Sequence, residues 1–283
     1  MLDRLRGLLP GKLGVSKPVV PVVRISGPIG LVTPLRPGVT LSTLAGPLER
    51  AFAVKGAPAV AIVINSPGGS PVQSHLIFRR IRALAEEKGR KVLCFVEDVA
   101  ASGGYMIACA ADEIVADPSS VVGSIGVVSQ GFGFVEAIHK LGIERRVHTA
   151  GGRKAILDPF RPEKPEDVEH LLSLQQEVHD TFADLVRERR GALLADDPQL
   201  FSGLFWTGKA GIGLGLVDTI GDLRGVLRDR YGPDVKLRLI ATERSWPWKR
   251  GGGVGIFGSG ATSLADDAVS ALEARALWNR YGL

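Results

Sequence analysis

The chain is organised around the stretch Glu97-Asp98-Val99-Ala100-Ala101-Ser102-Gly103-Gly104-Tyr105. An apolar, strand-like run occupies positions 92–96 before it, and positions 106–111 after it have the composition of a short helix. A serine at a strand-to-helix elbow presents its hydroxyl outside the sheet, and the N–H groups beside it can receive negative charge. The stretch therefore predicts either a nucleophile or a glycine-rich turn whose serine caps a helix.

Strand and helix patterns alternate on both sides of this elbow. The run 59–64 is apolar throughout, as expected for a strand buried on both faces of a parallel sheet. The alternation predicts one layered α/β domain with a mostly parallel sheet covered by helices. The other expected strands are 19–25, 91–96, 112–116, 121–128, 143–149 and 236–240, and the expected helices are 44–54, 76–88, 132–141, 166–190, 207–216 and 223–231.

Composition divides the chain into three parts. Residues 1–18 form an N-terminal arm, residues 19–245 the α/β domain, and residues 246–283 a glycine-rich linker followed by an amphipathic helix at about 263–281. We expect that helix to pack onto the body or onto a neighbouring subunit. No run of about 18 apolar residues occurs, so the sequence predicts no transmembrane anchor.

The composition also disfavours several classes of function. The net charge of +5 is a mild excess for 283 residues, and acidic residues interrupt the basic clusters, so we expect no nucleic-acid partner. The two cysteines, Cys94 and Cys109, lie in apolar runs without a CxxC pair. We expect them to be buried free thiols, and we predict no metal and no other cofactor.

A second glycine-containing elbow follows the buried run 59–64. It reads Ser66-Pro67-Gly68-Gly69, and the carboxyl ends of neighbouring parallel strands meet at one sheet edge. The N–H groups of Gly68 and Gly103 could therefore point at one carbonyl oxygen and form an oxyanion hole. The alternative is a pair of ordinary turns that need glycine for their backbone geometry.

A nucleophilic serine needs a general base, and the sequence offers two kinds of candidate: a lysine and the histidines. Lys154 follows Gly151-Gly152 at the end of an expected strand, where a neutral amine could act as general base, although most loop lysines are solvated. None of the five histidines lies in an elbow or a glycine-rich loop, so we expect structural or solvated roles for His75, His139, His148, His170 and His179.

Taken together, the motifs resemble those of the signal peptide peptidase A family of Ser/Lys serine peptidases. The resemblance rests on Asn65–Ser70, Ala100–Tyr105 and Gly123–Val127, followed by Lys154. The segments Phe205–Ala210 and Gly213–Asp218 are similar to the closing signature of that family, and the likeness covers about 19–227.

This resemblance implies a ClpP/crotonase-like fold, with 19–245 as the peptidase domain. It implies Ser102 as nucleophile, Lys154 as general base, Gly68 and Gly103 as oxyanion donors, and Ser124 as the residue that orients the lysine. Family members of this length are similar to octameric rings in which the serine and the lysine meet across a subunit boundary. The implied substrates are hydrophobic peptides or unfolded proteins, such as remnant signal peptides or misfolded polypeptides.

Three other interpretations remain beside this one. A ClpP-like Ser-His-Asp peptidase needs a histidine soon after the nucleophile, and 121–134 contains none. A crotonase-type acyl-CoA enzyme would use carboxylates such as Glu97 and Asp98. A catalytically silent ring scaffold or membrane-protein partner would not need the intact pair of Ser102 and Lys154. Without an anchor in the sequence, we expect a cytoplasmic protein, with peripheral contact to the inner membrane or to a membrane protein as an open alternative.

Overall fold

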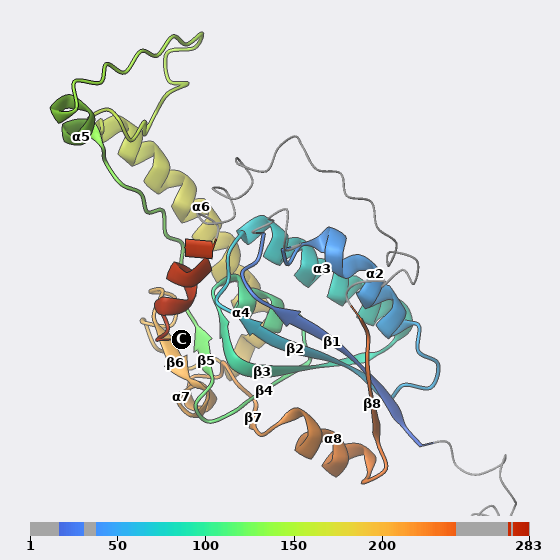
Figure 1. Ribbon diagram of the computed structural model, residues 1–283. Helices are drawn as coiled ribbons and strands as arrows, with labels where there is room; N and C mark the ends of the chain where they lie inside the picture. Colours follow the sequence, from blue (N-terminus) through green and yellow to red (C-terminus); the bar gives the residue numbers. More distant parts are fainter. Residues whose placement is uncertain (1–16, 31–37, 242–270, 273, 283) are drawn as a thin grey trace, which may run out of the picture.

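A single sheet of eight strands forms the centre of the computed structural model, which describes residues 17–30, 38–241, 271–272 and 274–282. Three parallel neighbours lie in its middle: β1 (Val19–Ser26), β2 (Ala59–Ser66) and β3 (Lys91–Ala101). The main path runs β6 (Phe205–Thr207), β5 (Val121–Gly123), β3, β2, β1 and β8 (Lys236–Leu239). Strand β4 (Glu113–Ala116) pairs with β3, and β7 (Thr219–Ile220) pairs with β4. Only β5 and β6 pair in the antiparallel direction among the described strands. The predicted α/β class with a mostly parallel sheet is confirmed (Figure 1).

Helices cover both faces of the sheet. Successive side chains of a strand point to opposite faces, so the apolar residues of the central strands contribute to two separate cores. On one face, Ile62 and Ile64 belong to a large core that includes residues of α2 (Leu41–Phe52), α3 (Pro71–Lys88) and α4 (Gly103–Ala108). On the other, Ala61 and Val63 share a smaller core with Leu227 of α8 (Leu223–Tyr231). Figure 1 shows α2 and α3 on one side of the sheet and α8 on the other. The continuous apolar run of β2 is thus explained by burial on both faces.

The two cysteines lie in the larger core as buried free thiols, as predicted. Burial raises the pKa of both thiols, to about 12 for Cys109. A thiol held in its neutral form is a poor nucleophile and a poor metal ligand, so these residues serve packing.

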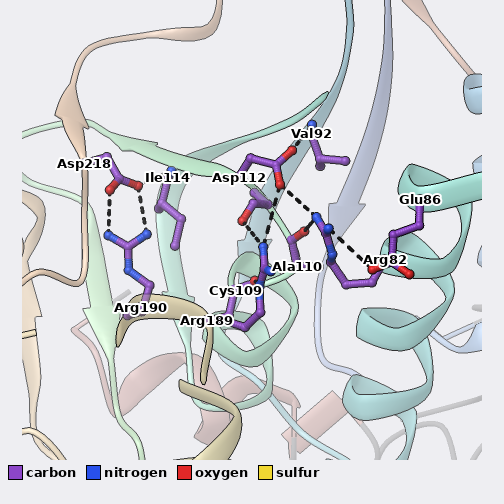
Figure 2. Close-up of polar contacts among 11 residues, drawn as sticks. Arg82, Glu86, Val92, Cys109, Ala110, Asp112, Ile114, Arg189, Arg190 and Asp218 are labelled. Carbon is purple, nitrogen blue, oxygen red and sulfur yellow. Dashed lines mark hydrogen bonds and ion pairs between the residues drawn. The ribbon is translucent and has the colours of Figure 1, made fainter. Parts of the chain in front are cut away.

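The long helix α6 (Pro165–Arg190) is anchored at its C-terminal end. Arg189 donates to the carbonyl oxygens of Cys109 and Ala111 at 2.9 and 3.0 Å, where the segment after α4 ends. Arg190, 5% exposed, donates to Gly215 O at 2.8 Å and forms two hydrogen bonds with Asp218 at 2.8 and 2.9 Å. We call Arg189 and Arg190, together with these hydrogen-bond partners, the arginine clamp. Figure 2 shows both arginine side chains extending from α6 to their partners.

The other half of α6 leaves the body. Its buried apolar residues lie between Phe182 and Val186, whereas most of 169–180 is exposed. The loop before it and α5 (Val135–Lys140) project in the same direction (Figure 1). We call 128–180 the projecting arm.

The remaining elements are short, and some differ from the prediction. Strand β5 (Val121–Gly123) ends earlier than expected because Gly123 and Ser124 adopt positive φ angles of 102° and 53°. Residues 205–207 pair with β5 as β6 (Phe205–Thr207), so the helix expected at 207–216 is only α7 (Gly208–Gly213). The other elements are β4 (Glu113–Ala116), the 3-10 turn η1 (Gly191–Leu193), β7 (Thr219–Ile220) and β8 (Lys236–Leu239).

The strand expected at 143–149 does not form. These residues lie in the projecting arm, nearly all exposed, with no described strand beside them to pair with. Strand propensity without a partner ladder does not make a strand.

The C-terminal helical segment packs onto the body of the same chain. Trp278 and Tyr281 contact a small core with Val99 and Ala101 of β3. The N-terminal arm at 1–16, the glycine-rich linker and the first part of the expected last helix lie outside the described residues. None of the described helices is long and apolar enough to cross a membrane.

Candidate active site

Ser102 occupies the elbow between β3 and α4 in a strained conformation. Its φ and ψ angles are 53° and −125°, values that non-glycine residues rarely adopt. Its N–H donates to Gly123 O at 2.8 Å, which ties the elbow to β5. The side chain is half-buried and lines a cavity of about 820 Å³, and its hydroxyl has no hydrogen-bond partner among the described residues. The hydroxyl is thus free to contact a ligand in this cavity, as the geometry of a strand-to-helix elbow allows.

The two glycine-containing elbows lie against each other. A Cβ atom added to Gly68 would lie 2.7 Å from Ser102 Cβ and 2.9 Å from Ala101 O, closer than real Cβ atoms approach. Gly68 also has a φ of +100°, so both space and backbone conformation favour glycine there. The turn after β2 and the elbow after β3 therefore form one continuous surface around the Ser102 hydroxyl.

The backbone donors at this surface differ in how they are engaged. The Gly103 N–H has no acceptor among the described residues, which suits an oxyanion donor. The Gly68 N–H donates to Ser66 Oγ at 3.2 Å, and the Ser66 hydroxyl donates onward to Gly27 O at 2.7 Å. The neighbouring Gly69 N–H has no acceptor in the described part of the chain. Sequence reasoning did not single out Gly69, although the double glycine of the turn is its signal.

Ser124 lies next to the same surface but contacts an unexpected residue. It is 4% exposed, and its N–H donates to Leu204 O at 2.7 Å. The Tyr281 hydroxyl lies 3.2 Å from Ser124 Oγ and 3.4 Å from Pro67 O. Tyr281 thus connects Pro67 of the first elbow to Ser124, which follows β5, from the C-terminal segment. No local pattern could have revealed this contact, because 157 positions separate Tyr281 from Ser124.

Lys154 lies in the projecting arm. It is exposed, in the loop between α5 and α6, which Figure 1 shows projecting away from the sheet, and it is not among the described residues that line the Ser102 cavity. The adjacent Arg153 ties this loop to the first turn of α6, donating to Glu166 O at 3.0 Å and to Asp167 Oδ1 at 3.1 Å. The two elbows and Ser102 therefore lie together within one chain, whereas Lys154 does not lie with them.

The other candidate residues lie apart from Ser102, with one exception. His179 of α6 lines the Ser102 cavity, and its Nε2 atom is buried without a partner in the described region. Glu97 and Asp98 line a different cavity, where they bond to Arg24 and Asn65. Within the described residues, no group of three or more His, Cys, Asp or Glu side chains could hold a metal ion.

Comparison with known proteins adds a family. Residues 84–230 match the sequence profile of peptidase family S49. A Brucella abortus protein described as the Na(+)/H(+) antiporter NhaA is 55% identical over 286 residues, covering 99% of this chain and 39% of that protein. The chloroplastic serine protease SPPA of Arabidopsis thaliana is 32% identical over 252 residues, covering 78% of this chain and 37% of that protein. This chain thus spans less than half the length of these two relatives.

Among solved structures, one similar chain is a mutant of the 1510-N membrane-bound stomatin-specific protease. The alignment covers 80% of this chain and 99% of that chain, with a TM-score of 0.45 and 17% sequence identity.

Proposed function

This chain belongs to peptidase family S49, and on that premise we propose that it is a serine peptidase with Ser102 as nucleophile and Lys154 as general base. The observation that carries the proposal is the strained Ser102 elbow, whose free hydroxyl lies against the Gly68–Gly69 turn and the Gly103 N–H. A side chain presented in this way, beside uncommitted backbone donors, suits attack on a carbonyl carbon.

The proposed reaction is acyl transfer to water. Ser102 Oγ attacks the scissile carbonyl while the neutral amine of Lys154 takes the hydroxyl proton. The Gly103 N–H and a donor from the Gly68–Gly69 turn bind the oxyanion. The protonated lysine then gives its proton to the leaving amine, and an acyl-enzyme remains. Lys154 next takes a proton from water, whose oxygen attacks the ester. As the bond to Ser102 Oγ breaks, the protonated lysine gives this proton to Oγ, and the acid product leaves.

We propose that the base comes from a neighbouring subunit in a homo-oligomeric ring, as the octameric family resemblance implies. Two observations support this. The loop that carries Lys154 projects away from the sheet of its own chain, and Lys154 does not line the Ser102 cavity. The projecting arm also carries large exposed apolar side chains, with Phe132 81%, Leu141 72% and Leu172 57% exposed. Apolar surface of this kind is typical of an interface between subunits.

The proposed substrates are hydrophobic peptides or unfolded polypeptides, including remnant signal peptides. Met106, Phe182, Phe201 and Leu277 contribute apolar wall to the Ser102 cavity, which suits such side chains. We propose that the chain acts in the cytoplasm or at the membrane surface, because the Brucella relative that contains a similar segment is described as an antiporter.

The test is cleavage of an unfolded, hydrophobic-rich polypeptide, followed by mass spectrometry. The wild type should cleave it, whereas Ser102→Ala and Lys154→Ala should each lose several orders of magnitude in rate. The exposed Ser173→Ala on α6 and Lys140→Ala on the same arm are matched controls and should cleave like the wild type. Cleavage that survives Lys154→Ala would give the base role to another group. No cleavage by the intact oligomer would favour the silent scaffold.

Complementation tests the subunit boundary. Co-expression of the Ser102→Ala and Lys154→Ala chains mixes them in one ring, where some sites combine an intact serine with a neighbour's intact lysine. Part of the activity should return, although each variant alone is inactive. Absence of rescue in mixed rings, confirmed by native mass spectrometry, would place both residues in one subunit.

A further inference from the structure

The C-terminal helical segment, residues 274–282, is fixed beside the candidate active site. Tyr281 is 9% exposed, and its hydroxyl lies within hydrogen-bond distance of Ser124 Oγ and Pro67 O. Its ring meets that of Phe205 edge to face, with the centroids 5.0 Å apart. Trp278, one turn earlier, packs beside it. These contacts hold the end of the segment against Pro67 of the first elbow and against the strand pair β5–β6.

Two residues next to this anchor line the cavity that contains Ser102: Leu277 and Arg280. Arg280 is exposed, and its guanidinium carbon lies 5.9 Å from the centroid of the Tyr281 ring. Such a contact orients an arginine without neutralising it. No carboxylate of the described residues forms an ion pair with Arg280.

The described lining of this cavity carries positive charge and no negative charge. Among the described residues that line it, Arg280 alone carries a permanent charge, and no Asp or Glu is present. The other polar groups are serine hydroxyls, backbone, glutamine amides and the imidazole of His179, whose Nε2 has no partner in the described region. The remaining wall is apolar. A ligand that fits this lining is an apolar peptide that carries one negative charge.

We propose that Arg280 is a specificity-determining residue that binds a carboxylate of the peptide substrate. The carboxylate belongs either to an acidic side chain or to the free C-terminus of a short peptide. A planar guanidinium binds a carboxylate through two parallel N–H donors, and the walls of a concave site reduce screening by water. This inference rests on the proposed peptidase function, because it assigns the substrate of the Ser102 cavity.

The test compares the cleavage of four peptides that share one apolar sequence. One pair differs by a single Asp or Asn near the cleaved bond, with the C-terminus amidated. The second pair lacks the acidic residue and ends either in a free acid or in an amide. We expect the wild type to prefer the acid over the neutral peptide in one of the pairs by about three- to tenfold in kcat/KM. The pair that shows the preference identifies the source of the carboxylate.

Variants assign the preference to Arg280. Arg280→Gln should bring the ratio of acid to neutral peptide close to one, and Arg280→Lys should keep part of it, since a charge remains without the planar fork. Arg275→Gln removes an exposed arginine from the same segment, outside the cavity, and should leave the ratio unchanged. Higher salt should reduce the wild-type ratio.

A binding measurement keeps this inference separate from the peptidase proposal. In the Ser102→Ala background, the dissociation constants of the same four peptides are measured by calorimetry, with and without Arg280→Gln. Tighter binding of the acid by about three- to tenfold, lost with Arg280→Gln, supports the carboxylate site even if no peptide is cleaved. Equal binding of acid and neutral peptides, or a ratio that Arg280→Gln does not change, overturns it.

Discussion

Replacing Gly68 by alanine tests whether the two elbows form one site. The new Cβ atom would lie 2.7 Å from Ser102 Cβ and 2.9 Å from Ala101 O, so the turn and the nucleophile must move apart by several tenths of an ångström. The matched control is Gly27→Ala. Gly27 has almost the same φ, +101° against +100°, but its Cβ would meet nothing within 4 Å.

The two variants separate backbone strain from the clash. Alanine at such a φ costs about 1–3 kcal/mol, of which about 0.4–1 kcal/mol is offset because alanine restricts the unfolded chain. Gly68→Ala adds a packing cost of about 1–3 kcal/mol. It should therefore be less stable than Gly27→Ala by about that amount. Because it displaces the nucleophile, it should also lose about 100-fold in peptidase rate, whereas Gly27→Ala should keep most of it.

The assay is urea unfolding followed by tryptophan fluorescence, at one protein concentration because oligomers gain stability with concentration. Peptide cleavage is measured on the same samples. Equal free energies of unfolding for Gly68→Ala and Gly27→Ala, together with a wild-type cleavage rate for Gly68→Ala, would refute the close approach of the elbows.

Two further predictions concern ion pairs that hold the body together. Arg190→Met leaves Asp218 partly buried without its partner and should cost about 3 kcal/mol of unfolding free energy, and adding Asp218→Asn should recover part of it; equal losses in the single and double variants would contradict the pairing. The hydrogen bond from Arg230 is the main cause that lowers the pKa of Glu113 below its usual 4.5, so the carboxylate form stabilises the fold above that pH and the contribution disappears as the pH falls below it. Glu113→Gln should therefore reduce stability at neutral pH and have little effect in strong acid, as measured by urea unfolding at both pH values; a pH-independent difference would exclude this origin.

The centre of the fold could be predicted from local sequence because burial leaves a strong signal there. The runs 59–64 and 92–96 are apolar on both faces, and the structure shows them as adjacent parallel strands. The elbows could be recognised in the sequence for a different reason. Gly68 packs so closely against Ser102 that a residue with a Cβ atom does not fit there, and glycine is therefore required. Core strands and close backbone approaches thus constrain residue type directly.

The features that sequence could not predict depend on distant partners. Residues 143–149 have strand-like composition, but the arm offers them no ladder. The contact of Tyr281 with Ser124 joins segments far apart in the chain, and a single buried tyrosine has no distinctive local pattern. The roles of Ser102, Lys154, Gly68, Gly103 and Ser124 remain predictions that the experiments above address.

The arginine clamp makes α6 a lever. From Pro165 to about Asp180 the helix extends roughly 24 Å beyond its anchored half, at 1.5 Å per residue. A tilt of about 5° at the point where the helix leaves the body, near Asp180, therefore moves the far end by about 2 Å, more than the tolerance of a hydrogen bond. Arg153 couples the Lys154 loop to that far end. If the serine of a neighbouring subunit uses this lysine, the contacts of Arg189 and Arg190 fix the direction of α6 in one subunit. They thereby set the position of the base in the active site of the neighbouring subunit.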